Sequence, residues 1–365
     1  MAKDFKNKIK RLELENFTCF GKVAMDFSPG INVFIGENGT GKTHLLKVLY
    51  ALSLEKKHEP LPVSNGNKNY MLNAAYNFIE IFKPDGNDLF RLVKHDEGIG
   101  CFTKITFGDD HQFIFKITKL NGKVGSGSDA VYKIPIKQCL YVPSLEFLSW
   151  FQGFIASYEN RESSIDASYY YLAKALALKP LKGQGKEDAI NLSQELANSI
   201  KLQSIKQNGD QFFIRLENSP YEVEAPMIAT GINKLAQLIY LIMNGSLTKD
   251  TILFWDEPEA NLNPKYILIV AKFLQTLANA GCQIFVATHD YLLPYELSLS
   301  KEYADVAEGK VPDMKFFALY KGENGTEVEE GETMPDLKHD AIMEGAGRHN
   351  DREDILFRKS LNREK

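Results

Sequence analysis

The chain has 365 residues, 44% hydrophobic and 25% charged, which is enough for a full core and a second lobe. Its net charge of −5 argues against a protein that coats nucleic acid through bulk electrostatics, while a local basic groove stays open. Four scattered cysteines without a C-x-x-C pair indicate neither a disulfide framework nor a zinc site. With no apolar stretch of membrane-spanning length and no secretory signal, we expect a cytoplasmic protein without a membrane partner.

The first half of the sequence opens with alternating apolar and polar residues, which predict short strands at 8–16 and 23–27. An apolar run at 31–35 predicts a buried parallel strand. A glycine-rich loop follows it, and residues 45–54 then have helical apolar spacing. The predicted order is therefore strand, loop, helix.

The middle of the chain is predicted as a loop, a meander and a helical lobe. Residues 56–69 are rich in Pro, Asn, Gly and Lys, which is typical of a surface loop. Between 76 and 119, apolar segments alternate with Gly, Asp and Asn turns and predict an antiparallel meander. These segments are 78–82, 89–93, 102–107 and 113–117. A strand at 140–142 comes before 145–203, where helical spacing predicts a lobe with a break at 179–183.

Strands and helices alternate in the last part of the sequence. We expect strands at 212–216, 251–255, 283–287 and near 315–320, with helices at 231–243 and 264–279. A charged tail follows residue 340. No heptad run lasts long enough for a coiled coil, so long arms are not expected.

A phosphate-binding loop is the most specific motif, because residues 36–43 fit the pattern G-x-x-x-x-G-K-[ST] in full. Its glycines let successive N–H groups converge on phosphates at the start of a helix. Lys42 should reach the β- and γ-phosphates of ATP, and Thr43 should hold Mg2+. An accidental match is disfavoured by the preceding strand and the following helix. The residues expected to contact ATP are Gly36, Glu37, Asn38, Gly39, Thr40, Gly41, Lys42, Thr43 and the adjacent His44.

Two carboxylates end the apolar strand at 251–255, as a Walker B element requires. Asp256 at the strand end can bind Mg2+, and Glu257 can act as the general base that polarises the attacking water. The plainer alternative is an acidic turn before a helix that Asn263 and Pro264 cap. A long insertion separates these acids from Lys42, which disfavours a minimal GTPase-like domain.

Three segments together resemble the ATPase heads of RecF, SMC and OLD-family proteins: Asn16–Phe20, Asp256–Pro264 and Phe285–His289. The resemblance implies an α/β P-loop NTPase fold, an ABC-type ATPase head with an antiparallel β subdomain and an inserted helical lobe. It also implies that Asn261–Asn263 form the D-loop, with Asn263 near nucleotide, and that His289 contacts the γ-phosphate. The implied domains are the first half of the head (1–140), the lobe (141–210), the second half (211–340) and the tail (341–365).

The family's signature motif would lie just before the helix at 231–243, where Thr230 and Gly231 match it and Ile232 replaces its second glycine. In the family this motif closes over ATP held by another subunit, which implies a dimer of heads or a higher homo-oligomer. A helix start capped by Thr230 is the structural alternative. The expected Q-loop after 140–142 has no glutamine, and Glu146 is either its substitute near Mg2+ or an ordinary carboxylate of the lobe.

The lobe from Val142 to Gly183 resembles compact bacterial AAA/ABC-hybrid ATPases that are often encoded in phage-defence operons beside a separate nuclease or toxin. The resemblance implies a sensor or regulator of such an effector. The last residues lack the D-x-D cluster of a Toprim nuclease, so no nuclease is expected in this chain.

Two other functions stay open. A DNA-repair or chromosome-maintenance ATPase of the RecF/SMC type would bind DNA directly, although the charge does not indicate it. The nucleotide subunit of a transporter is disfavoured by the weak signature and the missing glutamine.

A group of tyrosines near Arg161 could stack on bases, but packing within the lobe is the simpler interpretation. They are Tyr158, Tyr169, Tyr170 and Tyr171.

Overall fold

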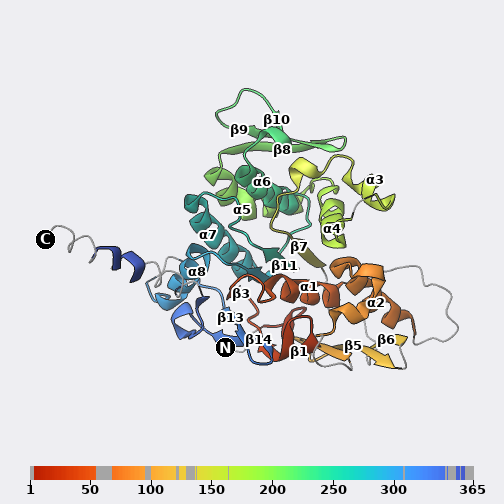
Figure 1. Ribbon diagram of the computed structural model, residues 1–365. Helices are drawn as coiled ribbons and strands as arrows, with labels where there is room; N and C mark the ends of the chain where they lie inside the picture. The colour runs from red at the N-terminus through yellow and green to blue at the C-terminus, as the bar shows by residue number, and fades with distance from the viewer. Residues whose placement is uncertain are drawn as a thin grey trace.

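The computed structural model of the chain, drawn in Figure 1, describes most of its residues. They are residues 4–54, 68–94, 100–120, 123–128, 136, 138–162, 164–306, 309–341, 343, 351–353 and 355–357. The predicted loop at 56–69, apart from its last two residues, and most of the predicted tail lie outside them. Among the described segments, no helix is both long enough and apolar enough to cross a bilayer.

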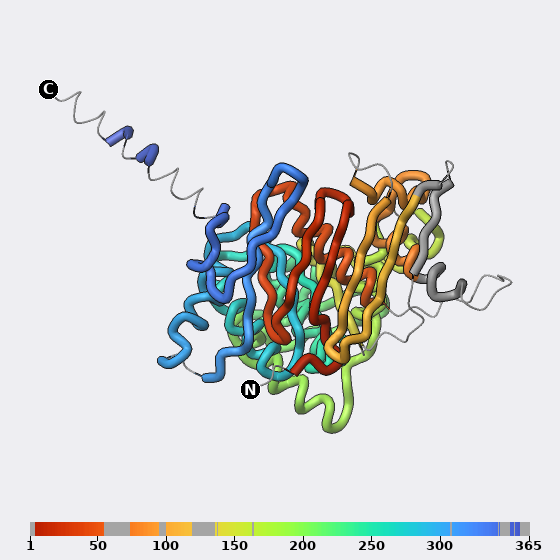
Figure 2. Tube along the Cα trace, turned by 90° about the horizontal axis from the view of Figure 1, so that it is seen from below, coloured from red at the N-terminus to blue at the C-terminus, as the bar shows by residue number. Residues whose placement is uncertain are grey.

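The strands of the head form a sheet in the order β6-β5-β4-β1-β2-β14-β13-β3-β12-β11-β7. Their bounds are β1 Ile9–Phe17, β2 Phe20–Asp26, β3 Ile31–Gly36, β4 Gly100–Phe107, β5 Gln112–Leu120, β6 Lys123–Ser128, β7 Gln138–Val142, β11 Thr251–Asp256, β12 Gln283–Ala287, β13 Met314–Gly322 and β14 Gly325–Gly331. The neighbours from β13 to β7 pair in parallel, and β6, β5, β4, β1 and β2 pair antiparallel in that order, with β1–β2, β4–β5 and β5–β6 as hairpins. Figure 2 shows β1, β2, β4 and β5 side by side with the β13–β14 hairpin.

The parallel strands β3, β11 and β12 are buried along their whole length, which confirms the buried parallel strand that the apolar run at 31–35 predicted. On one face of β3, Val33 joins the core under α6 and α7; on the other, Phe34 joins the core around α1. Helix α1 thus lies between the parallel strands and the antiparallel hairpins, which holds its first residues close to the strand ends. The helices are α1 Lys42–Ser53, α2 Lys68–Phe82, α3 Phe154–Glu159, α4 Ala167–Leu176, α5 Gln184–Ser199, α6 Thr230–Met243, α7 Pro264–Ala280 and α8 Leu292–Glu302.

Two of the predicted meander strands are wrong. Residues 78–82 belong to α2, where Ala74, Phe78 and Ile81 are buried at helical spacing. Residues 89–93 form a 3₁₀ turn, η2 (Leu89–Leu92), whose start is capped by the Asp88 side chain. Short apolar runs suit either a strand or a helix, and in both places neighbouring elements decided the outcome. The strands predicted at 102–107 and 113–117 are confirmed as parts of β4 and β5.

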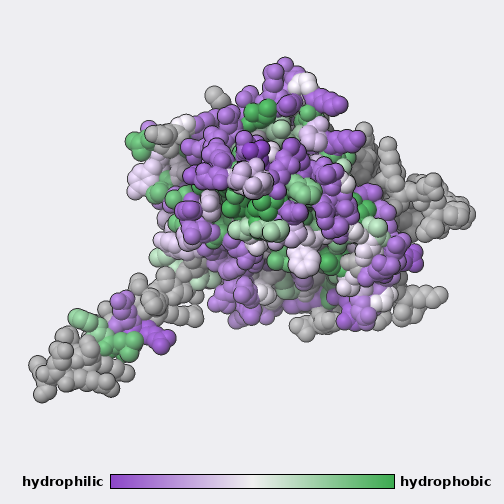
Figure 3. All heavy atoms as spheres, turned by 90° about the horizontal axis from the view of Figure 1, so that it is seen from above, coloured by the Kyte–Doolittle hydropathy of each residue, from purple (hydrophilic) through white to green (hydrophobic). Residues whose placement is uncertain are grey.

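The lobe contains α3, α4 and α5, and the predicted break falls between α4 and α5. After α5 the chain forms a separate antiparallel sheet from β8 (Leu202–Asn208), β9 (Gln211–Leu216) and β10 (Val223–Glu224). The turn of its first hairpin lies at 209–210, so the hairpin crosses the division expected between 210 and 211. The face seen from above, which carries this sheet, is mostly hydrophilic with hydrophobic side chains near its centre (Figure 3).

Candidate active site

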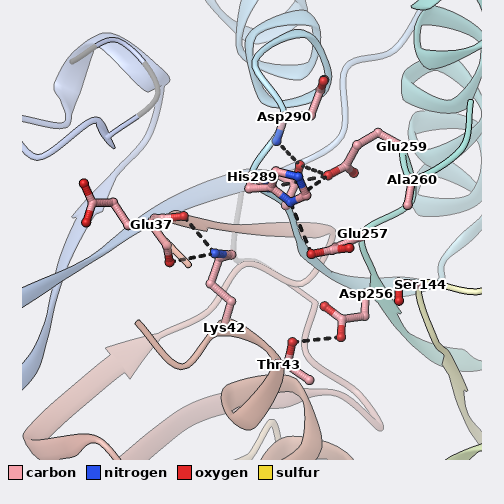
Figure 4. Close-up of polar contacts among 12 residues, drawn as sticks. Glu37, Lys42, Thr43, Ser144, Asp256, Glu257, Glu259, Ala260, His289 and Asp290 are labelled. Atoms are coloured by element: carbon pink, nitrogen blue, oxygen red, sulfur yellow. Dashed lines mark hydrogen bonds and ion pairs between the residues drawn. The ribbon is translucent and has the colours of Figure 1, made fainter. Parts of the chain in front are cut away.

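Three neighbouring parallel strands, in the order β3-β12-β11, bring the predicted motifs to one edge of the sheet. The phosphate loop follows β3, His289 follows β12, and Asp256 ends β11 before Glu257. The carboxyl ends of parallel strands lie at the same edge, where such folds bind ligands. The sheet order therefore assembles residues that are far apart in the sequence (Figure 4).

In the phosphate loop, Lys42 opens α1 and folds its side chain back over the loop. Its ammonium donates to the carbonyl oxygens of Gly36 at 2.7 Å and Glu37 at 3.0 Å. Burial lowers the pKa of Lys42, against the opposing effect of the Glu257 and Asp256 carboxylates. A buried cation that is held by neutral carbonyls is well placed to bind an anion such as a phosphate.

Gly41 precedes α1 with a φ of 93°, a left-handed conformation that favours glycine. A Cβ at this position would lie 2.4 Å from Cys19 Sγ and 2.9 Å from Phe20 Cζ. At Gly39, where φ is 81°, a Cβ would meet nothing within 4 Å. The loop is thus packed tightly against the β1–β2 turn at Gly41 and open at Gly39.

Gly41→Ala should lower the free energy of unfolding by about 2–5 kcal/mol, because it adds overpacking to backbone strain. Gly39→Ala is the matched control and should cost only the backbone strain of about 1–2 kcal/mol. Urea denaturation of both variants measures the difference. Equal destabilisation would show that the contact with the β1–β2 turn is not tight.

Thr43 and Asp256 meet as the motifs predict. The Thr43 hydroxyl donates to Asp256 Oδ2 at 2.9 Å, and the Tyr141 hydroxyl donates to the same oxygen at 3.3 Å. Burial raises the pKa of Asp256, against the opposing hydrogen bond from Thr43. A buried carboxylate beside a hydroxyl fits Mg2+, which takes one or two protein oxygens and completes its shell with phosphates and water. No cluster of three or more His, Cys, Asp and Glu side chains suited to a metal occurs in the described part of the chain.

Glu257 and His289 form a pair at the open side of the site. His289 Nδ1 lies 3.2 Å from Glu257 Oε1, and the two side chains are 49% and 33% exposed, respectively. Glu257 has a φ of 46°, an uncommon conformation for a residue with a side chain. Its N–H donates to the Ala287 carbonyl at 2.8 Å, which fixes the strained turn to the end of β12. Water can therefore reach an acid whose backbone is held in place.

Two buried charged residues were not predicted. Glu259 accepts from the Thr288 hydroxyl at 2.7 Å and lies 3.8 Å from His289 Nδ1, and burial raises its pKa. Lys234 on α6 donates to three backbone carbonyls near the acidic turn, and burial lowers its pKa to about 8. Glu259 is part of the acidic run after β11, which was a signal for it; Lys234 has no comparable signal in the sequence.

The remaining predicted residues lie around this centre. Thr230 begins α6, but the N-cap is Ala229 and no side chain caps the helix, so the alternative of a Thr230 cap is wrong. Gly231 packs on the segment at 261–262, since a Cβ there would lie 2.9 Å from the Asn261 carbonyl oxygen. Asn263 caps α7 by accepting from Lys265 N at 3.2 Å. Its contact with nucleotide stays a prediction.

His44 and Glu146 have local partners. The His44 ring lies edge-on to Phe82, with 5.6 Å between ring centroids. Glu146 is buried and accepts from Ser149 N at 3.2 Å, which favours the interpretation of an ordinary lobe carboxylate. In the tyrosine group, Tyr158 stacks on Tyr170 with centroids 4.5 Å apart, and Tyr171 donates to Glu80 at 2.6 Å. These contacts favour packing over base stacking.

Comparisons with known proteins agree with this geometry. A family model described as an AAA ATPase domain matches residues 8–223, more than half of the chain. The DNA replication and repair protein RecF of Streptococcus uberis is 52% identical over 50 residues, which are 14% of this chain and 14% of that protein. RecF of Staphylococcus carnosus is 41% identical over 73 residues, 20% of this chain and 19% of that protein. The chain thus spans about a fifth or less of these relatives.

Solved structures with a similar outline include two SMC heads. The SMC head domain from Thermotoga maritima is 11% identical with a TM-score of 0.45, over 88% of this chain and 98% of that one. An Smc head from Pyrococcus furiosus, bound to the C-terminal domain of ScpA, is 12% identical with a TM-score of 0.48, over 88% and 96%. The family match and the assembled motifs together show that the chain belongs to the AAA ATPase domain family.

Proposed function

We propose that the site binds ATP with Mg2+ and hydrolyses it to ADP and phosphate. The observation that carries this proposal is the joint placement of Thr43 beside Asp256 and of Glu257 beside His289, around the buried Lys42. Lys42 and the loop N–H groups would bind the β- and γ-phosphates. Mg2+, held by Thr43 and Asp256, would neutralise charge on the same phosphates.

In this mechanism Glu257 accepts a proton from a water molecule while the oxygen of that water bonds to the γ-phosphorus. The bond from the γ-phosphorus to the bridging oxygen breaks, and ADP leaves with that electron pair. As an imidazolium, His289 would donate from Nδ1 to the Glu257 carboxylate, which orients it, and from its other ring nitrogen to the γ-phosphate. The strained backbone at Glu257 supports the role of Glu257 as the general base, because backbone strain of this kind is concentrated at functional sites.

ATP binding is further proposed to close two heads into a homodimer or a higher homo-oligomer. The N-terminus of α6, at Thr230 and Gly231, has N–H groups that no capping side chain satisfies, which suits the phosphates of a neighbouring copy. Light scattering of Glu257→Gln with and without ATP and Mg2+ tests this step. A shift from monomer to dimer with ATP is expected, whereas a monomer under all conditions would contradict it.

The closed state is proposed to regulate a separate effector protein, such as a nuclease or toxin, in defence against phage. Large exposed apolar side chains in the lobe and on the turn beside it support a protein partner: Trp150 and Met227 are 71% and 75% exposed, on the neighbouring 3₁₀ turns η4 (Leu148–Trp150) and η5 (Ala225–Met227). Co-expression with the products of neighbouring genes tests it. Robust nuclease activity of the purified chain alone, abolished by Glu257→Gln, would contradict this division of labour.

The alternative is an ATPase that binds DNA directly in repair or chromosome maintenance. The two RecF relatives, which are named as DNA replication and repair proteins, favour it. DNA would then stimulate hydrolysis, and the stimulation would fall steeply as salt increases. Indifference of the ATPase rate to DNA would favour the effector hypothesis.

A further inference from the structure

Lys234 is a buried cation outside the predicted motifs. It lies in the second turn of α6, and only 1% of its surface is exposed. An ammonium group has three donors, and all three are used here on backbone carbonyls. Lys234 Nζ donates to the oxygens of Glu257 at 2.6 Å, Ser144 at 2.9 Å and Ala260 at 3.1 Å. Burying this charge is costly unless its donors are satisfied. The complete set of acceptors therefore indicates that the ammonium group has a fixed position.

The shortest of these bonds holds the residue that is proposed as the base. At Glu257 the φ of 46° costs about 1–2 kcal/mol, so the turn needs contacts that maintain it. Ala287 O accepts from Glu257 N on one side of this residue, and Lys234 donates to Glu257 O on the other. With both peptide groups fixed, the carboxylate is aimed at His289.

The same face of α6 holds the segment that follows β7. Gln237 Oε1 accepts from Phe147 N at 2.8 Å, and Asn233 Nδ2 donates to Ser149 Oγ at 3.1 Å. Lys234 differs from both because it also holds the turn from Glu257 to Ala260. A shift of α6 at its N-terminus would therefore reach Glu257 through Lys234.

We propose that Lys234 is a positioning residue for hydrolysis: it holds the Glu257 peptide in its strained conformation and ties that conformation to α6. This inference rests on the proposed ATPase function. Helix α6 begins with the residues proposed to meet the nucleotide of the other copy. Closure of the heads could therefore change the position of Glu257 through α6 and Lys234. ATP hydrolysis would then depend on the position of α6.

Lys234→Met tests the proposal, since methionine is an unbranched side chain without donors or charge. We expect kcat to fall about 10- to 100-fold, because a misaimed base loses part of the 10²–10⁴-fold contribution of general-base catalysis. The Kd for ATP should stay within about threefold, because Lys234 makes no contact with the phosphate loop. The matched control is Gln237→Met, which removes a buried polar group one turn away and should keep kcat near the native value.

The outcomes separate this inference from the proposed function. If Glu257→Gln loses hydrolysis while Lys234→Met keeps a native kcat, Lys234 has no positioning role although the ATPase assignment stands. If Glu257→Gln hydrolyses ATP normally, the proposed base itself is wrong. Equal losses of kcat in Lys234→Met and Gln237→Met would reduce Lys234 to a structural residue and overturn the proposal.

Two further variants sharpen the test. In a Glu257→Gln background, Lys234→Met should cause no further loss of kcat if Lys234 acts through Glu257. Lys234→Arg is the variant to use if Lys234→Met does not fold, because it keeps a cation at this position. Its planar guanidinium cannot serve the same three carbonyls, so kcat should still fall while ATP binding persists. A native kcat in Lys234→Arg, when Lys234→Met does not fold, would contradict the positioning role.

Discussion

Glu257→Gln should bind ATP as tightly as the native chain and hydrolyse it at least about 100-fold more slowly. The amide has the shape of the carboxylate but cannot accept the proton of the attacking water. Because the substitution leaves Lys42 and its contacts in the phosphate loop in place, the affinity for ATP should change little. Steady-state phosphate release and equilibrium binding of ATP measure the two effects separately.

Glu146→Gln is the control for this variant. It changes a carboxylate of the lobe that caps a turn through Ser149, so hydrolysis should continue at nearly the native rate. The reverse pattern, with a slow Glu146→Gln and an active Glu257→Gln, would move the base to the segment after β7.

Lys42→Ala should weaken ATP binding by about 30- to 5000-fold, because truncating one side of a buried charge pair costs about 2–5 kcal/mol. In this structure the ammonium lies over the loop, held by Gly36 and Glu37, where it can turn to phosphate oxygens without a large movement. Titration calorimetry with an ATP analogue in the presence of Mg2+ measures the loss.

The matched control is Lys47→Ala on the same helix. Lys47 pairs with Asp166 at 2.8 Å and so joins α1 to the lobe. Its removal should change stability but leave the affinity for ATP close to native. A similar loss of affinity in both variants would mean that general positive charge on α1, and not the phosphate loop, determines binding.

Much of the site was predictable because its motifs belong to short strand and loop units. Each motif can be recognised within a few residues: the glycine pattern before Lys42 predicts phosphate binding, and the acids after the apolar strand predict a metal ligand and a base. The order of the parallel strands then brings the two motifs together. The continuous apolar run at 31–35 likewise indicated the buried parallel strand β3.

The elements and residues that were predicted wrongly or missed depend on contacts between segments that are far apart in the sequence. Phe78 belongs to a helix because it packs against Phe17 and Phe115 of neighbouring strands, and a five-residue window does not contain that information. Lys234 resembles any lysine near a helix start until the fold brings the carbonyls of Ser144 and Glu257 to it. Helix α8 was not predicted, and its first turn depends on Asp290, whose side chain accepts from Leu292 N.

Lys42, Asp256 and Glu257 are proposed to surround one nucleotide, and a crystal structure of Glu257→Gln with ATP and Mg2+ would show whether they do. We expect the triphosphate in the loop at 36–43, the metal between Thr43 and Asp256, and the γ-phosphate beside residue 257 and His289. Nucleotide bound elsewhere, or a metal without Asp256 among its ligands, would overturn the proposed ATP site.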